Sequence, residues 1–121
     1  MKTVLVVDDQ LSHREMISDL LKGSGFKVAI ADDGDAALEQ IEARVPDLVI
    51  LDIVMPNVNG YEVCRQMKSN PISKDVPVIL CSIKAEEFDR YWGIRQGADA
   101  YVAKPFQPKE LLATVKKLLQ K

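Results

Sequence analysis

Five short apolar runs alternate with five segments of helical periodicity, and this alternation restricts the fold more than any other feature of the sequence. The runs cover residues 4–7, 26–31, 48–51, 78–81 and 100–103. Each has the length and the residue types of a strand. Because strands that are apolar on nearly every residue are buried on both faces, the pattern favours a parallel sheet that is covered by helices.

The segments between the runs carry helix signals. They cover about residues 11–22, 35–43, 60–69 and 85–96, and the last begins near Pro108. Gly25 and Gly97 follow the first and fourth segments, where glycine adopts positive φ at little cost. On the first helix, the buried face is expected to hold Met16, Ile17, Leu20 and Leu21.

The fourth helix is rich in aromatic residues, which at helical spacing are more often core than recognition surface. Ile94 and Gly97 fit a buried stripe, with Tyr91 beside them. Trp92 lies about 100° around the helix from Tyr91 and therefore at the edge of that stripe. We expect Tyr91 and Ile94 to be buried and Trp92 to be partly exposed.

Five consecutive β-α units predict a doubly wound α/β domain with a five-stranded parallel sheet in the order 2-1-3-4-5 and helices on both faces. The length of 121 residues is that of one domain. The sequence contains no internal repeat, low-complexity tract or linker. We expect a single domain over residues 1–121 that acts without an output domain.

Composition excludes several classes of function. The net charge is -2, and no long run of Lys and Arg offers the clustered charge that nucleic acid requires. No stretch approaches the roughly 20 apolar residues that span a membrane. Cys64 and Cys81 lie inside apolar patterns and are expected to be buried free thiols. We therefore expect a cytoplasmic protein whose partners are proteins.

Polar residues stand where four of the predicted strands end. Asp8 and Asp9 follow the first strand, Asp52 the third, Ser82 the fourth and Lys104 the fifth. In open sheets of this order, ligands bind outside the carboxyl ends of the strands. Three carboxylates, a hydroxyl and an ammonium are therefore expected to converge at one edge of the sheet.

Such a group of carboxylates requires a cation. Two of them 4 Å apart repel by about 4 kcal/mol at an effective dielectric constant near 20. Mg²⁺ prefers oxygen ligands and commonly combines one or two carboxylates with phosphate oxygens. A glycine-rich loop that binds phosphate through backbone N–H groups is missing after the first strand, where Asp8 and Asp9 stand instead. The pattern predicts Mg²⁺ with a phosphate group.

Together these motifs resemble the receiver domain of two-component response regulators, a chemotaxis-type family with a flavodoxin-like fold, over the whole chain. The resemblance is carried by Asp8-Asp9, by residues 52–60, by Ser82 and by residues 101–106. Each motif is weak alone, but the four occur in order at the ends of the expected strands. A weaker similarity, over residues 92–106, points to receivers of type IV pilus motility and phototaxis.

The resemblance implies that Asp52 accepts a phosphoryl group from the phosphohistidine of a sensor histidine kinase or phosphotransfer protein. It implies Mg²⁺ ligation by Asp9, Asp52 and the backbone carbonyl of Val54, with Asp8 holding a metal-bound water. Lys104, preceding a cis peptide bond to Pro105, would pair with Asp52 and then with its phosphoryl group. Such a protein catalyses only its own phosphorylation and dephosphorylation.

The resemblance also implies a switch. Ser82 would bind the phosphoryl group and draw in the loop after the fourth strand, and Tyr101 would rotate from an exposed to a buried position. Gly60 would allow a tight turn in the loop after Asp52. The face formed by the fourth helix, fifth strand and fifth helix would then bind another protein. The domain would be a monomer or a weak dimer.

Ile83 stands where this family usually has Ala or Gly. With Val54 it is predicted to slow attack by water on phosphorylated Asp52, although packing against the fourth helix is an equal alternative. His13, the only histidine, is expected to be a partly packed structural residue.

Two other functions compete with this one. Haloacid-dehalogenase phosphatases also phosphorylate an Asp after a strand but need an acid two residues later, where this chain has Val54. An inert binding module is disfavoured because all five expected active-site positions are filled.

Overall fold

The computed structural model describes residues 1–84 and 86–120, which form the predicted α/β domain. Its five strands are parallel and lie in the order β2-β1-β3-β4-β5. They are β1 (Thr3–Val7), β2 (Lys27–Ala31), β3 (Leu48–Leu51), β4 (Val78–Ser82) and β5 (Ala100–Ala103). The helices are α1 (Leu11–Gly23), α2 (Gly34–Ala43), α3 (Gly60–Ser69), α4 (Glu87–Arg95) and α5 (Pro108–Leu119). The predicted start of the fourth helix, Ala85, lies outside the described residues.

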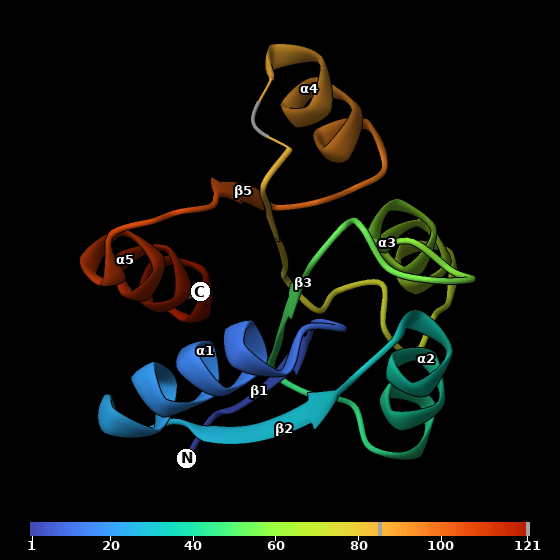
Figure 1. Ribbon diagram of the computed structural model, residues 1–121. Helices are drawn as coiled ribbons and strands as arrows, with labels where there is room; N and C mark the ends of the chain where they lie inside the picture. Colours follow the sequence, from blue (N-terminus) through green and yellow to red (C-terminus); the bar gives the residue numbers. More distant parts are fainter. Residues whose placement is uncertain (85, 121) are drawn as a thin grey trace.

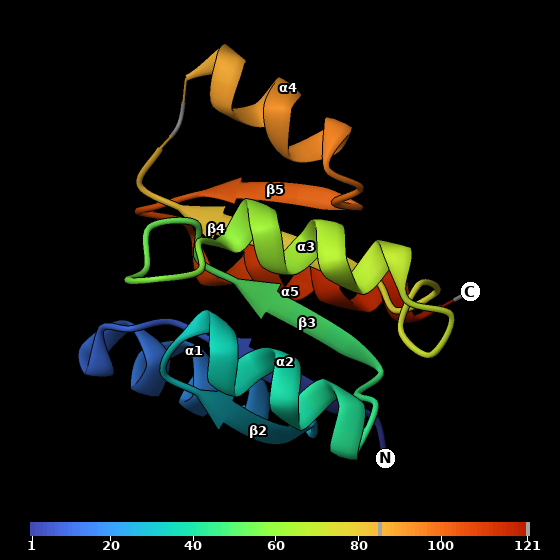
Figure 2. The ribbon, with the colours of Figure 1, turned by 90° about the vertical axis from the view of Figure 1, so that its right-hand side faces the viewer.

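The sheet separates two hydrophobic cores. Helices α1 and α5 lie on one face, and α2 and α3 on the other (Figures 1 and 2). Successive residues of β1 point to opposite faces, so Val4 and Val6 join the core under α1 and α5, and Leu5 and Val7 join the core under α2 and α3. The interior strands β1, β3 and β4 are thus buried on both faces, as predicted.

Two predictions of burial were wrong at the margins of the domain. On the edge strand β2, Ile30 is half exposed, because the strand has a neighbour on one side only. On α1, Ile17 and Leu21 are buried and Leu20 is partly buried, but Met16 is exposed. The predicted apolar face of α1 was therefore too wide.

Helix α4 differs most from its prediction. Tyr91 and Ile94 are 59% and 52% exposed, so the expectation that they are buried was wrong, whereas the partial exposure of Trp92, at 42%, is confirmed. Only Gly93 is buried within this helix. A Cβ atom on Gly93 would lie 2.8 Å from Leu80 Cδ1 and 3.1 Å from the Tyr101 ring. The glycine lets α4 approach the sheet at one point.

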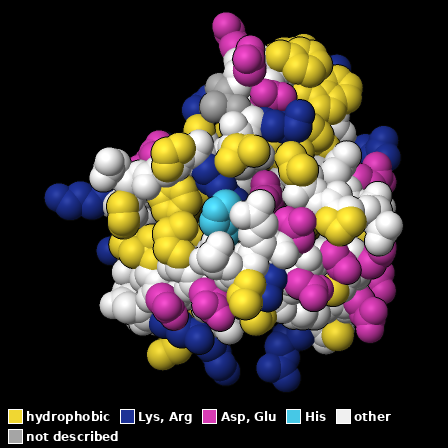
Figure 3. Space-filling view, viewed as in Figure 1, with side chains coloured by type: hydrophobic (Ala, Val, Ile, Leu, Met, Phe, Trp, Pro, Cys, Tyr) yellow, Lys and Arg dark blue, Asp and Glu magenta, His cyan; other side chains and the backbone are white. Residues whose placement is uncertain are grey.

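Besides its charged residues, α4 exposes large hydrophobic side chains. The rings of Phe88 and Trp92 stack on each other with their centroids 6.4 Å apart, and hydrophobic side chains gather over this helix in the space-filling view (Figure 3). The helix lies beyond the edge strand β5 (Figure 1), so the sheet offers it little area to cover. No helix among the described residues is long and apolar enough to cross a membrane.

Candidate functional site

Strand pairing brings the predicted acidic residues together. Val7 pairs with Leu51 at the end of β1 and β3, so Asp8 and Asp52 follow partnered residues. The backbone N–H of Asp52 donates to the Val7 carbonyl at 3.0 Å. Because both strands end at the same level, their next side chains lie at one edge of the sheet.

Asp8, Asp9 and Asp52 form a compact acidic cluster. One carboxylate oxygen from each lies within 4.8 Å of the other two, and within the described part of the chain no other three residues of metal-binding type do so. Asp8 and Asp52 are 1% and 7% exposed, while Asp9 faces solvent. Three hard oxygen donors at this spacing, one open to solvent, suit Mg²⁺.

Lys104 places its ammonium among these carboxylates. Its Nζ donates to Asp8 Oδ2 at 2.7 Å and to Asp52 Oδ2 at 3.4 Å, and its side chain is 7% exposed. The backbone N–H of Lys104 donates to the Ser82 carbonyl at 2.8 Å, which ties the lysine to the end of β4. The Lys104–Pro105 bond is cis, as expected.

The charges in this cluster only partly balance. Burial raises the pKa of Asp52, and Asp8 adds to the rise, whereas Lys104 and the N–H of Ile53 oppose it. Burial also opposes the charge of Lys104, but the hydrogen bond to Asp8 and the charges of both carboxylates leave its pKa raised. The lysine stabilises Asp8 more than Asp52 because it lies closer to Asp8. Asp52 therefore keeps an incompletely neutralised carboxylate.

The two oxygens of Asp52 have different partners. Oδ1 accepts the N–H of Ile53 at 2.7 Å, and Oδ2 faces Lys104. The hydrogen bond from the Ile53 N–H fixes the carboxylate plane.

Gly60 lies behind Asp52: a Cβ there would collide with the Asp52 carbonyl oxygen and lie 2.8 Å from Ile53 Cα. Gly60 is needed because the start of α3 approaches the Asp52 backbone. Its φ is not positive, so the predicted tight turn requires the missing side chain and not a left-handed backbone.

Ser82 and Tyr101 are both hydrogen-bonded to the backbone of Lys84. The Ser82 hydroxyl, which is buried, accepts the N–H of Lys84 at 3.2 Å, and the Tyr101 hydroxyl donates to the carbonyl of Lys84. The Tyr101 ring is half buried, with the Arg90 guanidinium 5.3 Å from its centroid. The loop after β4 thus connects the end of the sheet to the side chain that lies beneath α4.

Val54 and Ile83 flank the site with exposed side chains. Val54 is half exposed, and its carbonyl as a metal ligand stays a prediction. Ile83 is 69% exposed, so the alternative that it packs against α4 was wrong. Ile83 lines a hollow of about 390 Å³ together with Met16, Pro105 and Phe106, and His13 and Lys104 line the same hollow.

His13 is the residue of the site that the sequence did not reveal. Its side chain is partly packed, as predicted, at 32% exposed. Its Nδ1, however, lies 3.0 Å from Lys104 Nζ. No motif marks this position, and the contact exists only because the side chain of Lys104, which follows β5, reaches α1.

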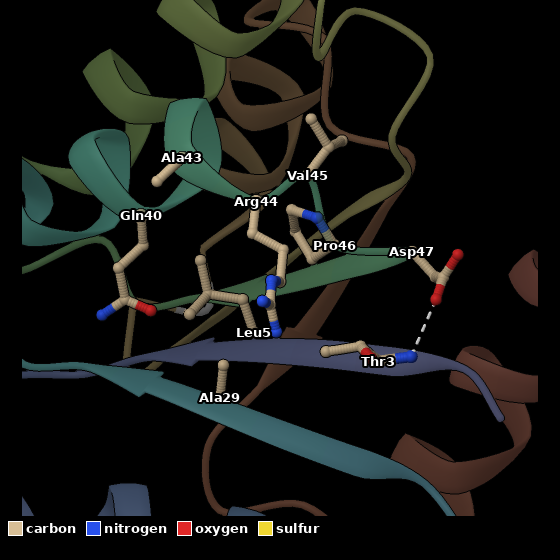
Figure 4. A pocket seen from close by; sticks show the side chains of 9 residues that line it. All are labelled: Thr3, Leu5, Ala29, Gln40, Ala43, Arg44, Val45, Pro46 and Asp47. Atoms are coloured by element: carbon tan, nitrogen blue, oxygen red, sulfur yellow. Dashed lines mark hydrogen bonds between the residues drawn. The ribbon is translucent and has the colours of Figure 1, made fainter.

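Other features lie outside the cluster. Cys64 and Cys81 are buried free thiols, as predicted, and burial raises the pKa of Cys64 to about 11 and that of Cys81 to about 12. A second hollow, of about 330 Å³, lies between α2 and the start of β1 (Figure 4). Its rim includes Asp47, whose carboxylate accepts the N–H of Thr3 at 2.8 Å. Because it lies at the opposite ends of the strands, it takes no part in the site.

Comparisons with known proteins agree with this geometry. The family model of the response regulator receiver domain matches residues 4–116. The chain is 40% identical over 120 residues to the alkaline phosphatase synthesis transcriptional regulatory protein PhoP of Bacillus subtilis, covering 99% of this chain and 49% of that protein. The chain spans about half the length of the curated relatives it matches.

Two solved structures match over nearly their whole length. A putative response regulator from Chloroflexus aurantiacus superposes with a TM-score of 0.96 at 35% identity, covering 99% of this chain and 98% of that one. The chemotaxis protein CheY4 of Vibrio cholerae superposes with a TM-score of 0.92 at 32% identity, covering 98% and 99%.

Proposed function

The chain belongs to the receiver domain family of two-component response regulators, and from that premise we propose that Asp52 is its phosphoryl acceptor. The donor would be the phosphohistidine of a sensor histidine kinase or phosphotransfer protein. The observation that carries the proposal is the contact of Lys104 with both Asp8 and Asp52 beside an open acidic cluster. This arrangement supports phosphoryl transfer because it pairs a nucleophilic carboxylate with the Lys104 ammonium, which can stabilise the negative charge of the transferred phosphoryl group.

In the proposed reaction a carboxylate oxygen of Asp52 attacks phosphorus. A P–O bond forms, the P–N bond of the donor breaks, and its electron pair returns to the donor imidazole. The Ile53 N–H holds Oδ1 and thereby orients the carboxylate. Lys104 is close enough to move from Asp8 to an oxygen of the new phosphoryl group.

Asp8, Asp9, Asp52 and the carbonyl of Val54 would hold Mg²⁺. When bound, Mg²⁺ supplies positive charge that offsets the carboxylates and the oxygens of the transferred group. The carboxylates of the cluster provide the hard oxygen donors for this role.

Switching would pass through the loop after β4. A phosphoryl oxygen that takes a hydrogen bond from Ser82 would draw Ser82 and the bonded Lys84 toward Asp52. The carbonyl of Lys84 also accepts a hydrogen bond from the Tyr101 hydroxyl. Tyr101 and the overlying α4 would therefore move with Lys84. The face of α4, β5 and α5 would thus change its affinity for a partner protein.

The rest of the pathway stays open to experiment. The curated relatives are named as transcriptional or DNA-binding regulators, and about half of their length has no counterpart in this chain. Four statements stay predictions. They are a role in type IV pilus motility or phototaxis, action of the domain without an output domain, a monomeric or weakly dimeric state, and a cytoplasmic location.

Phosphotransfer profiling against candidate kinases tests the proposal. We expect the cognate donor to add one phosphoryl group by mass, only with Mg²⁺ present. Asp52→Asn should abolish the gain, and Asp35→Asn, on the exposed first turn of α2, should leave it intact. A gain of phosphate by Asp52→Asn would refute the assignment.

The rival functions have their own tests. With Mg²⁺, beryllofluoride should change the fluorescence of Trp92, and an unchanged signal together with no phosphoryl gain would favour an inert binding module. Hydrolysis of small phosphate esters would favour a phosphatase. We expect none, because the side chain two residues after Asp52 is the aliphatic Val54.

Ile83 is proposed to slow hydrolysis of phosphorylated Asp52 by shielding it from water. Its exposed position beside Lys104 supports this role. We expect Ile83→Ala to lose phosphate faster by a fewfold in an autodephosphorylation assay. An unchanged rate would remove Ile83 from the mechanism.

A further inference from the structure

The imidazole of His13 makes a contact with Lys104 that the proposed function does not use. Lys104 Nζ has three partners: Asp8 Oδ2 at 2.7 Å, His13 Nδ1 at 3.0 Å and Asp52 Oδ2 at 3.4 Å. An ammonium has three N–H donors, which these three acceptors match. Because the contact with Asp52 is the longest, the lysine is held mainly by Asp8 and His13.

The contact defines which nitrogen of His13 carries the proton. An ammonium only donates hydrogen bonds, so Nδ1 must offer its lone pair and the ring proton must lie on Nε2. The opposite arrangement, a protonated imidazole paired with Asp8 Oδ2 at 3.9 Å, would point an N–H at the ammonium 3.0 Å away. Repulsion between the two cations disfavours it.

We propose that His13 is a positioning residue for Lys104: its Nδ1 holds the ammonium beside Asp8 and out of a close ion pair with Asp52. The inference rests on the proposed function of Asp52. When Lys104 moves to a phosphoryl group, this contact breaks. A contact made only in the unphosphorylated state stabilises that state alone, so His13 lowers the affinity of the site for a phosphoryl group.

The position of the pair supports this role. The side chain of Lys104 is 7% exposed, so water competes little for its donors. The imidazole is 32% exposed and opens into the hollow that Met16, Ile83 and Phe106 line. In Figure 3 the histidine side chain, shown in cyan, reaches the surface. His13 can therefore be changed without opening a core.

The first experiment measures the tautomer. Because the chain has one histidine, ¹⁵N-histidine labelling yields a single pair of ring signals. At pH about 8, where imidazole is ordinarily neutral, we expect the proton on Nε2 in the ligand-free protein. Lys104→Met should change this signature, and Lys109→Met, at the exposed start of α5, should not. A proton on Nδ1, or no response to Lys104→Met, would overturn the inference.

The second experiment measures affinity for beryllofluoride in the presence of Mg²⁺ by fluorine NMR. We expect His13→Leu to bind about three- to tenfold more tightly, since a hydrogen bond to a charged group no longer has to break. His13→Asn should stay within about twofold of the native protein, because its amide oxygen can accept from Lys104 as Nδ1 does. Equal affinities for all three proteins would refute the positioning role.

The two measurements separate this inference from the proposed function. If the native protein binds no beryllofluoride, the proposed function fails and the positioning role fails with it. The tautomer signature in the ligand-free protein then shows whether the contact itself exists. If the native protein binds beryllofluoride and both variants behave alike, only the role of His13 is refuted.

Discussion

Two regions of the molecule depart from the usual distribution of residues in opposite senses. At the carboxyl ends of the strands, Asp8, Asp52 and Lys104 bury charge, whereas α4 exposes four large hydrophobic side chains. Buried charge needs a partner charge or a cation, and exposed apolar surface needs a cover. Changes in the first region should therefore alter the stability of the domain, and changes in the second should alter only what it binds.

The two regions are connected by one short loop. Lys84 joins Ser82, beside the cluster, to Tyr101, whose ring lies close to Gly93 of α4. Since Gly93 is the only buried residue of α4, the helix packs lightly against the rest of the domain. A shift of the loop can thus move α4 without disturbing the core.

The largest effect should follow from Lys104→Met without Mg²⁺. Removing one partner from a buried ion pair costs about 3 kcal/mol, so the unfolding free energy measured in urea should fall by this amount. Because the pKa of Lys104 is raised, its contribution is complete below the unfolded pKa and is lost as pH rises through the folded value. Lys109→Met is the control and should cost less than about 0.5 kcal/mol.

Mg²⁺ should stabilise the same region. A ligand at ten times its dissociation constant adds about 1.4 kcal/mol to the unfolding free energy, and a chelator should reverse the gain. Thermal melts with and without Mg²⁺ measure this, with Ca²⁺ for comparison. Asp9→Asn should reduce the gain, because Asp9 is one of the three carboxylates. Equal gains in both proteins would place the cation elsewhere.

Asp52→Asn should increase stability by about 1 kcal/mol at neutral pH, since it removes one of two mutually repelling buried carboxylates. The sign follows from the raised pKa of Asp52. Ionising a carboxyl group whose pKa is raised in the folded state destabilises the fold. The stability gain of Asp52→Asn should therefore appear as pH rises from the unfolded pKa of Asp52 to its folded pKa. Urea melts across this range test it, and a gain that grows as pH falls would contradict the assignment.

The smallest effect belongs to α4. Ile94→Ala removes an exposed side chain and should change the unfolding free energy by less than about 0.5 kcal/mol. Leu111→Ala on α5, at a position that is fully buried, should cost about 3 kcal/mol. A large loss for Ile94→Ala would mean that α4 supports the fold and would end the contrast between the regions.

Much of this molecule could be predicted residue by residue. The strands over residues 48–51 and 100–103 and the helix over residues 60–69 match their predictions. The prediction of the cluster needed only the rule that parallel strands end at one edge of the sheet. Burial was less predictable, because Met16, Tyr91 and Ile94 follow helical periodicity but have no core to face.

The sequence by itself determined the fold class, the strand order and the meeting of Asp8, Asp9 and Asp52, because periodicity and strand ends are local properties of the chain. Only the tertiary structure decided which apolar residues of α4 face solvent, why Gly60 must lack a side chain, and that His13 contacts Lys104. These depend on how far two elements approach each other, and residues 91 positions apart in the chain meet there. No local pattern encodes that distance.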